Sequence, residues 1–369
     1  MARTIDALAL EVRKDDWAAT RIVRADLVTS LAANEVLFEI DRLALTSNNI
    51  SYAAYGDELG YWRFFPADDE GWGRIPAMGW ASVAASAHPD VRVGERVWGF
   101  FPMATHLKVL AGNVSAGHFQ DISAHRADLA PIYSRFDRAV ANPIYEEARE
   151  DQDSLLRGLF MTSWLVHDFL TVNDSFGANG CVITSASSKT SIALAHCVKA
   201  SGKLLSIGVT SARNVAFCKG LDCYDTVLTY DQVDQLPAGE PVVLVDMAGS
   251  AAVLSALHHH YGDNMKYSCR IGATHIDQMG AVDGLPGATP EFFFAPSHVQ
   301  TRSREIGAEN LMMQLGAGYV GFRLFCDGWL QVERHYGAAA SEAAYQQVLA
   351  GTVDPSSGQI ISLWENAGD

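Results

Sequence analysis

One stretch near the middle of the chain constrains the fold more than any other. It opens with a short apolar run at 181–184, continues with small polar residues at 185–191, and then carries apolar residues at helical spacing over 192–198. A second apolar run follows at once, at 203–209. This order predicts a strand, a tight turn, a helix and a second strand. The turn of such a βαβ unit is where nucleotide phosphates bind.

The turn lacks the glycines by which a dinucleotide-binding fold lets its backbone approach a pyrophosphate. Its place is taken by Ala186, Ser187, Ser188, Lys189 and Thr190. Small side chains still allow a close approach, and hydroxyl and ammonium groups can donate to phosphate oxygens. The last four residues are therefore candidate phosphate ligands. An ordinary buried βαβ unit with a serine-rich turn is the alternative.

The residues after the second strand bear on which dinucleotide would fit. In NAD-binding folds an acidic side chain at this place bonds the ribose 2′-hydroxyl, whereas an arginine accommodates the 2′-phosphate of NADP. The segment 210–214 contains no Asp or Glu. Thr210, Ser211 and Arg213 offer hydroxyl and guanidinium donors, which suit a dianionic phosphate. NADP(H) is therefore the predicted cofactor. The alternative is that Arg213 caps the next helix or is only solvated.

Composition limits the class of protein. The length of 369 residues suggests two domains or one large domain, and 49% hydrophobic with 19% charged residues is ordinary for a globular protein. The formal net charge of −16 argues against general nucleic-acid binding and against anionic membrane surfaces. No apolar run reaches the roughly 18 residues of a membrane span, and no apolar signal region opens the chain. A small molecule is the expected partner.

The six cysteines include no Cys-x-x-Cys pair and lie mostly in apolar contexts. Buried, reduced thiols are the simplest interpretation of that pattern. Such thiols are usual in a cytoplasmic protein, which is the location we expect.

The pattern of apolar residues along the chain changes near residue 155. Strand-like stretches predominate before it, at 19–23, 35–45 and 106–110. After it, apolar runs alternate with helical patterns, which predicts a doubly wound α/β sheet. Residues 241–247 are apolar almost throughout, as in a strand buried on both faces. Beyond Pro290 we predict a long helix over 305–325, a strand near 331–334, a helix over 341–350 and a closing strand at 359–363.

Several segments, taken in order, resemble the medium-chain dehydrogenase/reductase superfamily, and within it the zinc-free quinone-reductase-like branch. The most specific match is the turn Val91-Arg-Val-Gly-Glu-Arg-Val-Trp-Gly99. Further matches lie at 35–40, 241–249, 343–351 and 357–363. Two segments, 61–66 and 185–190, are similar to the family of proteins that carry the domain of unknown function DUF2855.

The resemblance implies a two-domain α/β fold. A GroES-like β domain would comprise residues 1–140 and 301–369, and a Rossmann domain with a doubly wound parallel sheet would occupy residues 141–300 between its two parts. A substrate cleft is expected at the junction. Members of the superfamily often pair through the edge of the Rossmann sheet, so the resemblance also implies a homodimer.

The chain departs from the zinc-dependent members of the superfamily. Those members carry a cysteine early in the β domain and a Gly-His-Glu further on, whereas the corresponding segments here read Thr46-Ser-Asn-Asn49 and Gly79-Trp-Ala81. Zinc needs three or four Cys, His or carboxylate ligands, and these segments supply none. We therefore expect no metal. The run His258–His260 falls on a predicted helix, where neighbouring side chains diverge, and is expected to be structural.

Reduction of a carbonyl or enone by hydride transfer needs a donor that stabilises charge on the substrate oxygen. In the zinc-free branch this falls to hydroxyl or amide groups near the vacant metal position. The candidates are Asn48, Asn49, Tyr52 and Tyr55. The asparagines would otherwise cap a short helix, and the tyrosines would otherwise only fill the core.

The resemblance also assigns further cofactor contacts. Thr162 and Ser163, expected at the start of the first interdomain helix, would touch the nicotinamide carboxamide or else cap that helix. Tyr230 would lie along the adenosine or else belong to the core. The strand-end turns with the residues Met247, Ala248, Gly249 and Gly272 would face the nicotinamide ribose.

Two functions therefore remain open. The first is a zinc-independent, NADPH-dependent oxidoreductase that reduces an enone, a quinone or a carbonyl. The second is a catalytically silent relative that keeps the fold as a nucleotide-binding or structural protein. A serine hydrolase is disfavoured, because the serine-rich turn lacks the Gly-x-Ser-x-Gly pattern of a nucleophile elbow.

Overall fold

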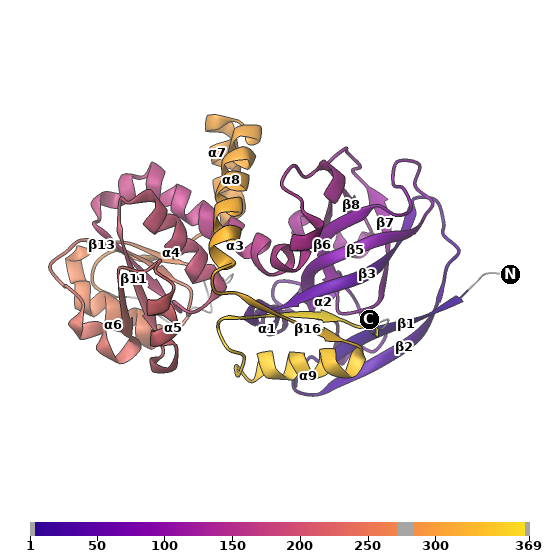
Figure 1. Cartoon of the computed structure of the whole chain (residues 1–369), viewed down its shortest axis with the longest axis horizontal. Coiled ribbons are helices and arrows are strands. Elements are labelled where there is room, and N and C mark those ends of the chain that lie inside the picture. The colour runs from indigo at the N-terminus through magenta and orange to yellow at the C-terminus, as the bar shows by residue number, and fades with distance from the viewer. Residues whose placement is uncertain (1–3, 272–283, 366–369) are drawn as a thin grey trace. The chain divides into compact units, whose positions relative to one another are not determined.

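The computed structural model describes residues 4–271 and 284–365. Internal contacts divide the chain into two compact units (Figure 1). The barrel unit comprises Met1–Leu155 and Leu330–Asp369, and the sheet unit comprises Leu156–Trp329. The helix α3 (Glu150–Val172) crosses the first division.

The second division lies later than the boundary at 300 that the sequence suggested. Its physical cause is the helix α8 (Ala308–Cys326), which belongs to the sheet unit. The rings of Tyr319 and Phe322 on α8 lie 5.6 and 5.2 Å from the ring of Phe160 on α3. Burial of these aromatic rings against one another holds α8 to the sheet unit.

Strands dominate the barrel unit. Its N-terminal part contains β1 (Thr4–Arg13), β2 (Thr20–Val28), β3 (Glu35–Leu45), β4 (Trp72–Gly73), β5 (Pro76–Ser86), β6 (Arg96–Pro102), β7 (His106–Gly112), β8 (His118–Asp121) and β9 (Arg135–Arg138), with the helices α1 (Ser47–Ala54) and α2 (Tyr61–Phe64). Its C-terminal part adds β16 (Gln331–Tyr336), α9 (Ala338–Leu349) and β17 (Ser357–Ser362).

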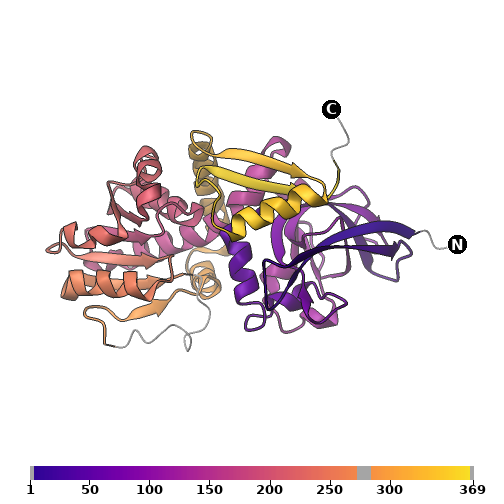
Figure 2. The same ribbon diagram turned by 90° about the horizontal axis from the view of Figure 1, so that it is seen from below.

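The strand order of the main sheet is β16-β17-β3-β5-β6-β9-β8-β7, and β3 also pairs with β7. That extra pairing closes the strands from β3 to β7 into a barrel. Phe38, Phe101, Phe119 and Phe136 fill its interior with ring centroids 4.7–5.9 Å apart. Burying each such ring contributes about 1.5–3 kcal/mol. Figure 2 shows α9 lying along β16 and β17.

The sheet unit alternates strands with helices. Its elements after α3 are β10 (Gly180–Thr184), α4 (Lys189–Ser201), β11 (Leu205–Thr210), α5 (Val215–Gly220), β12 (Thr226–Thr229), β13 (Val242–Asp246), α6 (Ala251–Tyr261), β14 (Met265–Arg270), β15 (Pro290–Phe292), α7 (Ala295–Ile306) and α8. The strands pair in the order β12-β11-β10-β13-β14-β15, with every pairing parallel. Helices cover both faces of this sheet (Figure 2). The expected doubly wound sheet and its fully buried strands β10 and β13 are confirmed.

One expected helix is wrong. The sequence predicted a single helix over 305–325, but α7 ends at Ile306 and α8 begins at Ala308. Gly307 between them has φ +86°, which lies in the left-handed region that glycine adopts without steric cost. No helix in the described part of the chain is long and apolar enough to cross a membrane.

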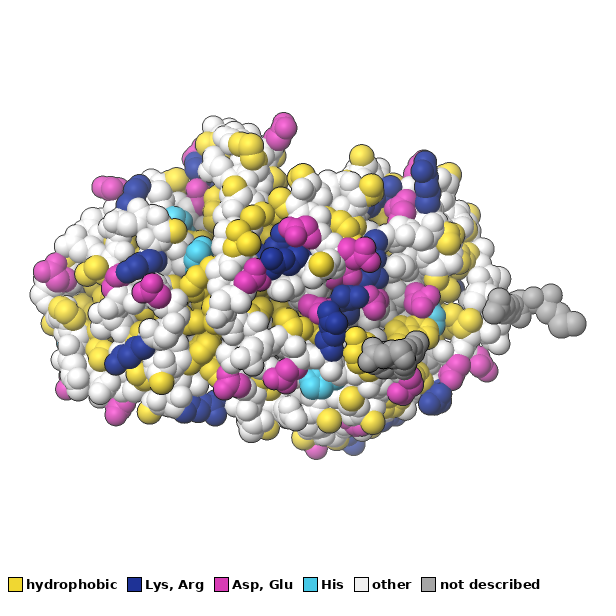
Figure 3. Space-filling view, in the orientation of Figure 1, with side chains coloured by type: hydrophobic (Ala, Val, Ile, Leu, Met, Phe, Trp, Pro, Cys, Tyr) yellow, Lys and Arg dark blue, Asp and Glu magenta, His cyan; other side chains and the backbone are white. Residues whose placement is uncertain are grey.

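Charges of both signs are mixed on the face of the molecule that Figure 3 shows. On the face drawn in Figure 3, the Lys and Arg side chains are scattered among Asp and Glu side chains and form no continuous basic stripe there.

Candidate functional site

The carboxyl edge of the parallel sheet is the natural place for a ligand in the sheet unit. The strand order changes direction between β10 and β13, and ligands of open α/β sheets bind outside the carboxyl ends of the strands at such a point. Thr184 ends β10 and Asp246 ends β13. The Thr184 hydroxyl donates to Asp246 Oδ1 over 2.7 Å, so the two strand ends are joined directly across the change of direction.

The predicted phosphate turn lies at this edge. Ser185 leads from β10 into the turn with φ +51°, a left-handed conformation that costs a non-glycine residue energy. Ser188 caps α4, because its Oγ accepts the Ser191 N–H over 3.2 Å. Lys189 and Thr190 are the first residues of α4, and N–H groups of a first helical turn favour anions.

Close packing holds this turn against the next strand. A Cβ atom on Gly208 of β11 would lie 2.9 Å from the Cβ of Ala186, so only glycine allows the approach. The Tyr224 hydroxyl donates to the Ala186 carbonyl over 2.7 Å. The turn itself contains no glycine, and the glycine that permits the close approach is Gly208 on the neighbouring strand.

The side of the edge next to β11 gathers several of the predicted residues around Ser187. The Ser187 Oγ accepts from Asn214 Nδ2 over 2.8 Å and from the Thr210 hydroxyl over 3.4 Å. Thr210 is 1% exposed, so its role is to orient Ser187. Ser211 is half-buried, and Arg213 is exposed in the short 3-10 helix Ala212–Asn214 that follows.

Two further residues complete this side. Tyr230 is half-buried after β12; burial raises its pKa, and interactions with Ser185 oppose the rise, which places the ring beside the turn. Asn214 was missed by the sequence analysis. Only its polar side chain close behind Arg213 could have suggested it, and the contact with Ser187 spans two separate elements.

The loop after β13 forms the other side of the edge. The N–H groups of Met247 and Ala248 donate to Thr184 Oγ1 over 2.8 and 3.0 Å, and the Gly249 N–H donates to Asp246 Oδ1 over 3.3 Å. Gly249 has φ +66°, the backbone freedom that was expected of it. Gly272, the other predicted glycine, lies outside the described residues.

Thr162 and Ser163 lie within α3 rather than at its start, because α3 begins twelve residues before Thr162, at Glu150. Ser163 is fully buried, and its hydroxyl donates to the Thr190 carbonyl over 2.7 Å. That bond fastens α3 to the first turn of α4. Thr162 is half-buried beside it. Helix capping, the alternative considered for this pair, is therefore wrong.

In the barrel unit the four candidate catalytic residues lie on or next to α1. Asn49 is 2% exposed; its Oδ1 accepts the Thr46 N–H and its Nδ2 donates to the Pro76 carbonyl, each over 2.7 Å. Its amide is therefore used to cap α1 and tie it to β5. Asn48 is exposed, and Tyr55 follows the last residue of α1.

Tyr52 belongs to a cluster of aromatic rings. Its ring centroid lies 4.6 Å from Tyr61, 5.3 Å from Phe100 and 6.4 Å from Tyr133. Burial raises the pKa of Tyr52 well above its ordinary value, and the neighbouring Tyr133 hydroxyl raises it further. Burial also raises the pKa of Tyr133, whereas contacts with Tyr61 and Tyr52 oppose the rise. The cluster thus holds three protonated phenols together.

Tyr133 was not predicted. It lies in a short segment without periodicity, and nothing in its neighbours along the chain points toward Tyr52. The aromatic segment 61–65 buries Tyr61, Phe64 and Phe65 in this same cluster.

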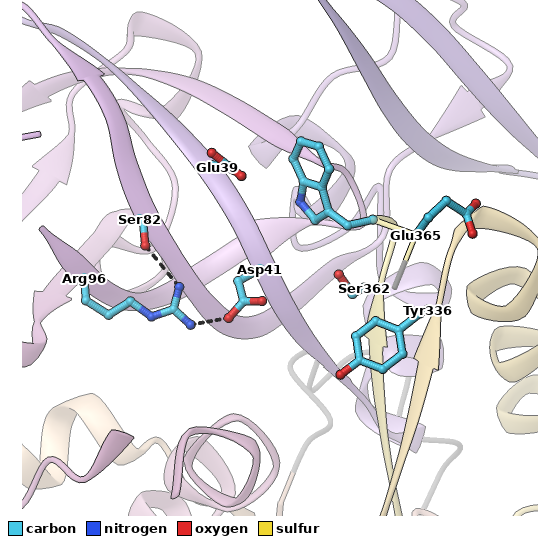
Figure 4. A pocket seen from close by; sticks show the side chains of 8 residues that line it. Glu39, Asp41, Ser82, Arg96, Tyr336, Ser362 and Glu365 are labelled. Atoms are coloured by element: carbon cyan, nitrogen blue, oxygen red, sulfur yellow. Dashed lines mark hydrogen bonds and ion pairs between the residues drawn. The ribbon is translucent and has the colours of Figure 1, made fainter. Parts of the chain in front are cut away.

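A cavity of about 380 Å³ also opens in the barrel unit (Figure 4). Its lining mixes acidic, hydroxyl, aromatic and guanidinium side chains: Glu39, Asp41, Ser82, Arg96, Tyr336, Ser362, Trp364 and Glu365. The Arg96 guanidinium donates to Asp41, to Ser82 and to Glu150. None of the residues predicted from the sequence lines this cavity.

The described residues contain no group of three or more His, Cys, Asp or Glu side chains arranged to hold a metal ion. The segment 46–49 forms the N-terminal cap of α1, and 79–81 lies within β5. His258 is buried between the Pro286 carbonyl and the Ser268 hydroxyl, at 3.0 and 2.9 Å, which accords with the structural role expected for it.

Solved structures with this fold are numerous. A Mesorhizobium loti protein provisionally assigned as an NADPH:quinone reductase is 14% identical, with 98% of this chain and 99% of that chain covered and a TM-score of 0.59. CurA from Vibrio vulnificus in complex with NADPH is 12% identical, with 95% of each chain covered and a TM-score of 0.59. The mitochondrial 2-enoyl thioester reductase Etr1p/Etr2p of Candida tropicalis is 13% identical, with 97% and 100% covered and a TM-score of 0.57.

At these identities the likeness shows a shared fold. The expected combination of a GroES-like β domain with a Rossmann sheet, as in the medium-chain dehydrogenases/reductases, is confirmed. No curated protein is matched by the sequence. The family model described as a protein of unknown function, DUF2855, matches residues 43–354, which is most of the chain. The chain therefore belongs to the DUF2855 family, as its resemblance to that family suggested.

Proposed function

We propose that this protein is a zinc-independent oxidoreductase that uses NADPH to reduce an enone, a quinone or a carbonyl compound of moderate size. The single observation that carries the proposal is the arrangement around Ser187 at the carboxyl edge of the sheet. There, Asn214 and Thr210 hold a serine hydroxyl in place and Arg213 follows on the surface. The solved structures of similar fold support it, because one of them is a complex with NADPH.

The residues present fit a phosphorylated dinucleotide. A serine hydroxyl has one proton to donate and two lone pairs. Because the Asn214 amide and the Thr210 hydroxyl donate to the lone pairs of Ser187, its own proton is left to donate to an acceptor such as a phosphate oxygen. Arg213 would supply charge to the 2′-phosphate, and the absence of a carboxylate from 210–214 removes repulsion. Lys189 and the first turn of α4 would hold the pyrophosphate.

The bound nicotinamide would supply hydride. What the protein must add is a donor for the substrate oxygen, on which negative charge develops. Tyr52 is the strongest candidate, because its phenol is protonated over the whole ordinary pH range and Tyr61 and Tyr133 surround it. Tyr55 and Asn48 are the next candidates. Asn49 is the weakest, since both ends of its amide already bond the protein.

Binding and turnover of NADPH test the proposal together. NADPH fluorescence should change on titration with the protein, with a dissociation constant below about 1 mM. NADPH absorbance should then fall with at least one member of a panel of enones, quinones and aldehydes. Turnover that survives exhaustive chelation would support the zinc-free form. Absence of NADPH binding would overturn the proposal.

A catalytically silent nucleotide-binding or structural role is the second candidate. The observation in its favour is Ser185, which holds a strained left-handed conformation where a glycine would be free of strain. NADPH that binds but is not oxidised with any acceptor of the panel would favour this role.

We also propose a homodimer in a reducing, cytoplasmic compartment. Six buried thiols with no disulfide accord with such a compartment. Size-exclusion chromatography with light scattering should give twice the chain mass. A monomer would contradict the proposed homodimer but would leave the cofactor proposal unaffected.

A further inference from the structure

Two buried charged side chains at the carboxyl edge of the sheet have bonding capacity that no other described residue uses. Asp246 is 1% exposed and Arg270 is 5% exposed. Asp246 Oδ1 accepts from Thr184, but Asp246 Oδ2 has no hydrogen bond in the described part of the chain. Arg270 Nε lies 3.9 Å from that oxygen, and neither Arg270 Nε nor Arg270 Nη1 has a hydrogen-bond partner among the described residues.

The sheet places this pair beside the point where the strand order reverses. Asp246 ends β13 and lies level with Arg270, which ends β14. Thr184, at the end of β10, lies on the other side of Asp246. The three side chains therefore form a row along the edge where ligands of doubly wound sheets bind.

Leaving such groups unpaired is costly. A buried donor or acceptor without a partner costs about 1–3 kcal/mol, and a charged one costs more. Folded proteins therefore satisfy nearly all of them, and an exception at the carboxyl edge of a doubly wound sheet, where ligands bind, points to a partner that arrives with a ligand. The 3.9 Å ion pair compensates the charges but leaves two guanidinium nitrogens and one carboxylate oxygen without a hydrogen bond among the described residues.

The open groups define the chemistry of that partner. An N–H of Arg270 Nη1 can donate to a carbonyl oxygen, and the nearby carboxylate oxygen Asp246 Oδ2 can accept from an N–H donor. A primary carboxamide carries both groups on one carbon. A plain carbonyl would leave the carboxylate unsatisfied, and a carboxylate ligand would be repelled by it.

We propose that Arg270 and Asp246 together bind the primary carboxamide of the nicotinamide ring, with Arg270 on its oxygen and Asp246 Oδ2 on its amino group. The inference rests on the proposed function, because it requires a nicotinamide cofactor in the sheet unit. It assigns recognition of the reactive ring to side chains that the sequence analysis did not consider, and it separates that recognition from the adenosine side around Arg213.

Isothermal titration with two probes tests the assignment. NADP⁺ carries the carboxamide, whereas adenosine 2′,5′-bisphosphate carries only the adenosine and its phosphates. Arg270→Gln should weaken NADP⁺ binding by about tenfold or more, and leave the bisphosphate within about twofold. Lys199→Gln is the matched control: it also removes a cation from the sheet unit, one that pairs with Asp225 at the far end of α4. It should leave both affinities unchanged.

A second measurement needs no mutation and stands even if Arg270→Gln fails to fold. The 3-acetylpyridine analogue of NADP⁺ keeps the carbonyl oxygen but lacks the amino group. The native protein should bind it several-fold more weakly than NADP⁺, because Asp246 Oδ2 loses its donor.

Each outcome decides one question. Equal affinity for NADP⁺ and the acetylpyridine analogue, or equal losses of both probes in Arg270→Gln, overturns the carboxamide assignment while cofactor binding stands. If the native protein binds neither NADP⁺ nor the bisphosphate, the proposed function itself fails.

Discussion

The Thr184 hydroxyl donates to Asp246 Oδ1 over 2.7 Å and accepts the Met247 and Ala248 N–H groups. One threonine thus joins the end of β10 to the end of β13 and to the loop that follows it. Because these hydrogen bonds all lie within the sheet unit, the protein itself holds the two strand ends and the loop in place. Preorganisation of this kind lowers the cost of binding.

The contact between Gly208 and Ala186 gives a stability prediction. Gly208→Ala would drive a methyl group to 2.9 Å from the Ala186 Cβ and the Tyr224 ring. Overpacking of this kind costs about 1–3 kcal/mol, and each kcal/mol should lower the melting temperature by about 2–4 °C. NADPH affinity should fall too, because Ala186 belongs to the phosphate turn. Differential scanning calorimetry and fluorescence titration measure the two effects.

Gly220→Ala is the control for that substitution. Gly220 ends α5, and a Cβ atom there would meet nothing within 4 Å. Alanine should be neutral or slightly stabilising at this place. If both variants had the same melting temperature, the close approach at Gly208 would not contribute to stability.

Burial raises the pKa of Cys181, Cys197 and Cys223 to about 12 in each case. The unfolded chain releases these protons near pH 9, so above that pH it loses protons that the folded state retains. The stabilising contribution is thus complete below about pH 9 and is lost as the pH rises toward 12. Urea denaturation across that interval should show falling stability, with a shallower fall in Cys181→Ala.

The same thiols should be inert in the native protein. All six cysteines are free and buried, and only an accessible thiolate reacts quickly. A thiol reagent at pH 8 should therefore label the native protein slowly and the urea-unfolded protein at once. A rapidly labelled native cysteine would show that one thiol reaches solvent and that its raised pKa is wrong.

Tyr52 gives a catalytic prediction. Tyr52→Phe should lower the turnover number by about a hundredfold or more, since a positioned proton donor contributes at least that much. The dissociation constant of NADPH should stay the same. Because the pKa of Tyr52 is raised, its phenol remains protonated, and the rate should not fall through its ionisation below about pH 10.

Tyr145→Phe is the matched control for Tyr52. The Tyr145 hydroxyl donates to Glu150 Oε1 over 2.9 Å, and burial raises its pKa to about 12. Like Tyr52 it is a phenol of the barrel unit whose pKa is raised, but its hydroxyl is bonded to the Glu150 carboxylate. Its loss should leave turnover intact, so an equal fall in both variants would assign the effect to stability.

How far the sequence predicts this molecule depends on the range of each interaction. Strand, turn and helix patterns are local, so β10, α4 and β13 were placed correctly from spacing alone. Pairings across the chain leave no such trace: Asn214 meets Ser187, and Tyr133 meets Tyr52, over separations that no periodicity encodes. Asp246 and Arg270 escaped notice for the same reason.

Backbone conformation explains the other differences. The helical pattern over 305–325 runs on after Gly307, but the left-handed φ of that residue ends α7 there. Ser185 adopts a left-handed conformation that a residue-by-residue reading assigns to glycine. Both effects are visible only once the fold is known.

The affinity for NADPH against NADH in the native protein and in Arg213→Gln tests the central claim most directly. The two cofactors differ only in the 2′-phosphate, and a hydrogen-bonded guanidinium contributes about 1.5–3 kcal/mol. The native protein should prefer NADPH by at least about tenfold, and Arg213→Gln should lose most of that preference while NADH affinity stays unchanged. Equal affinities in the native protein, or equal losses for both cofactors in the variant, would contradict the account.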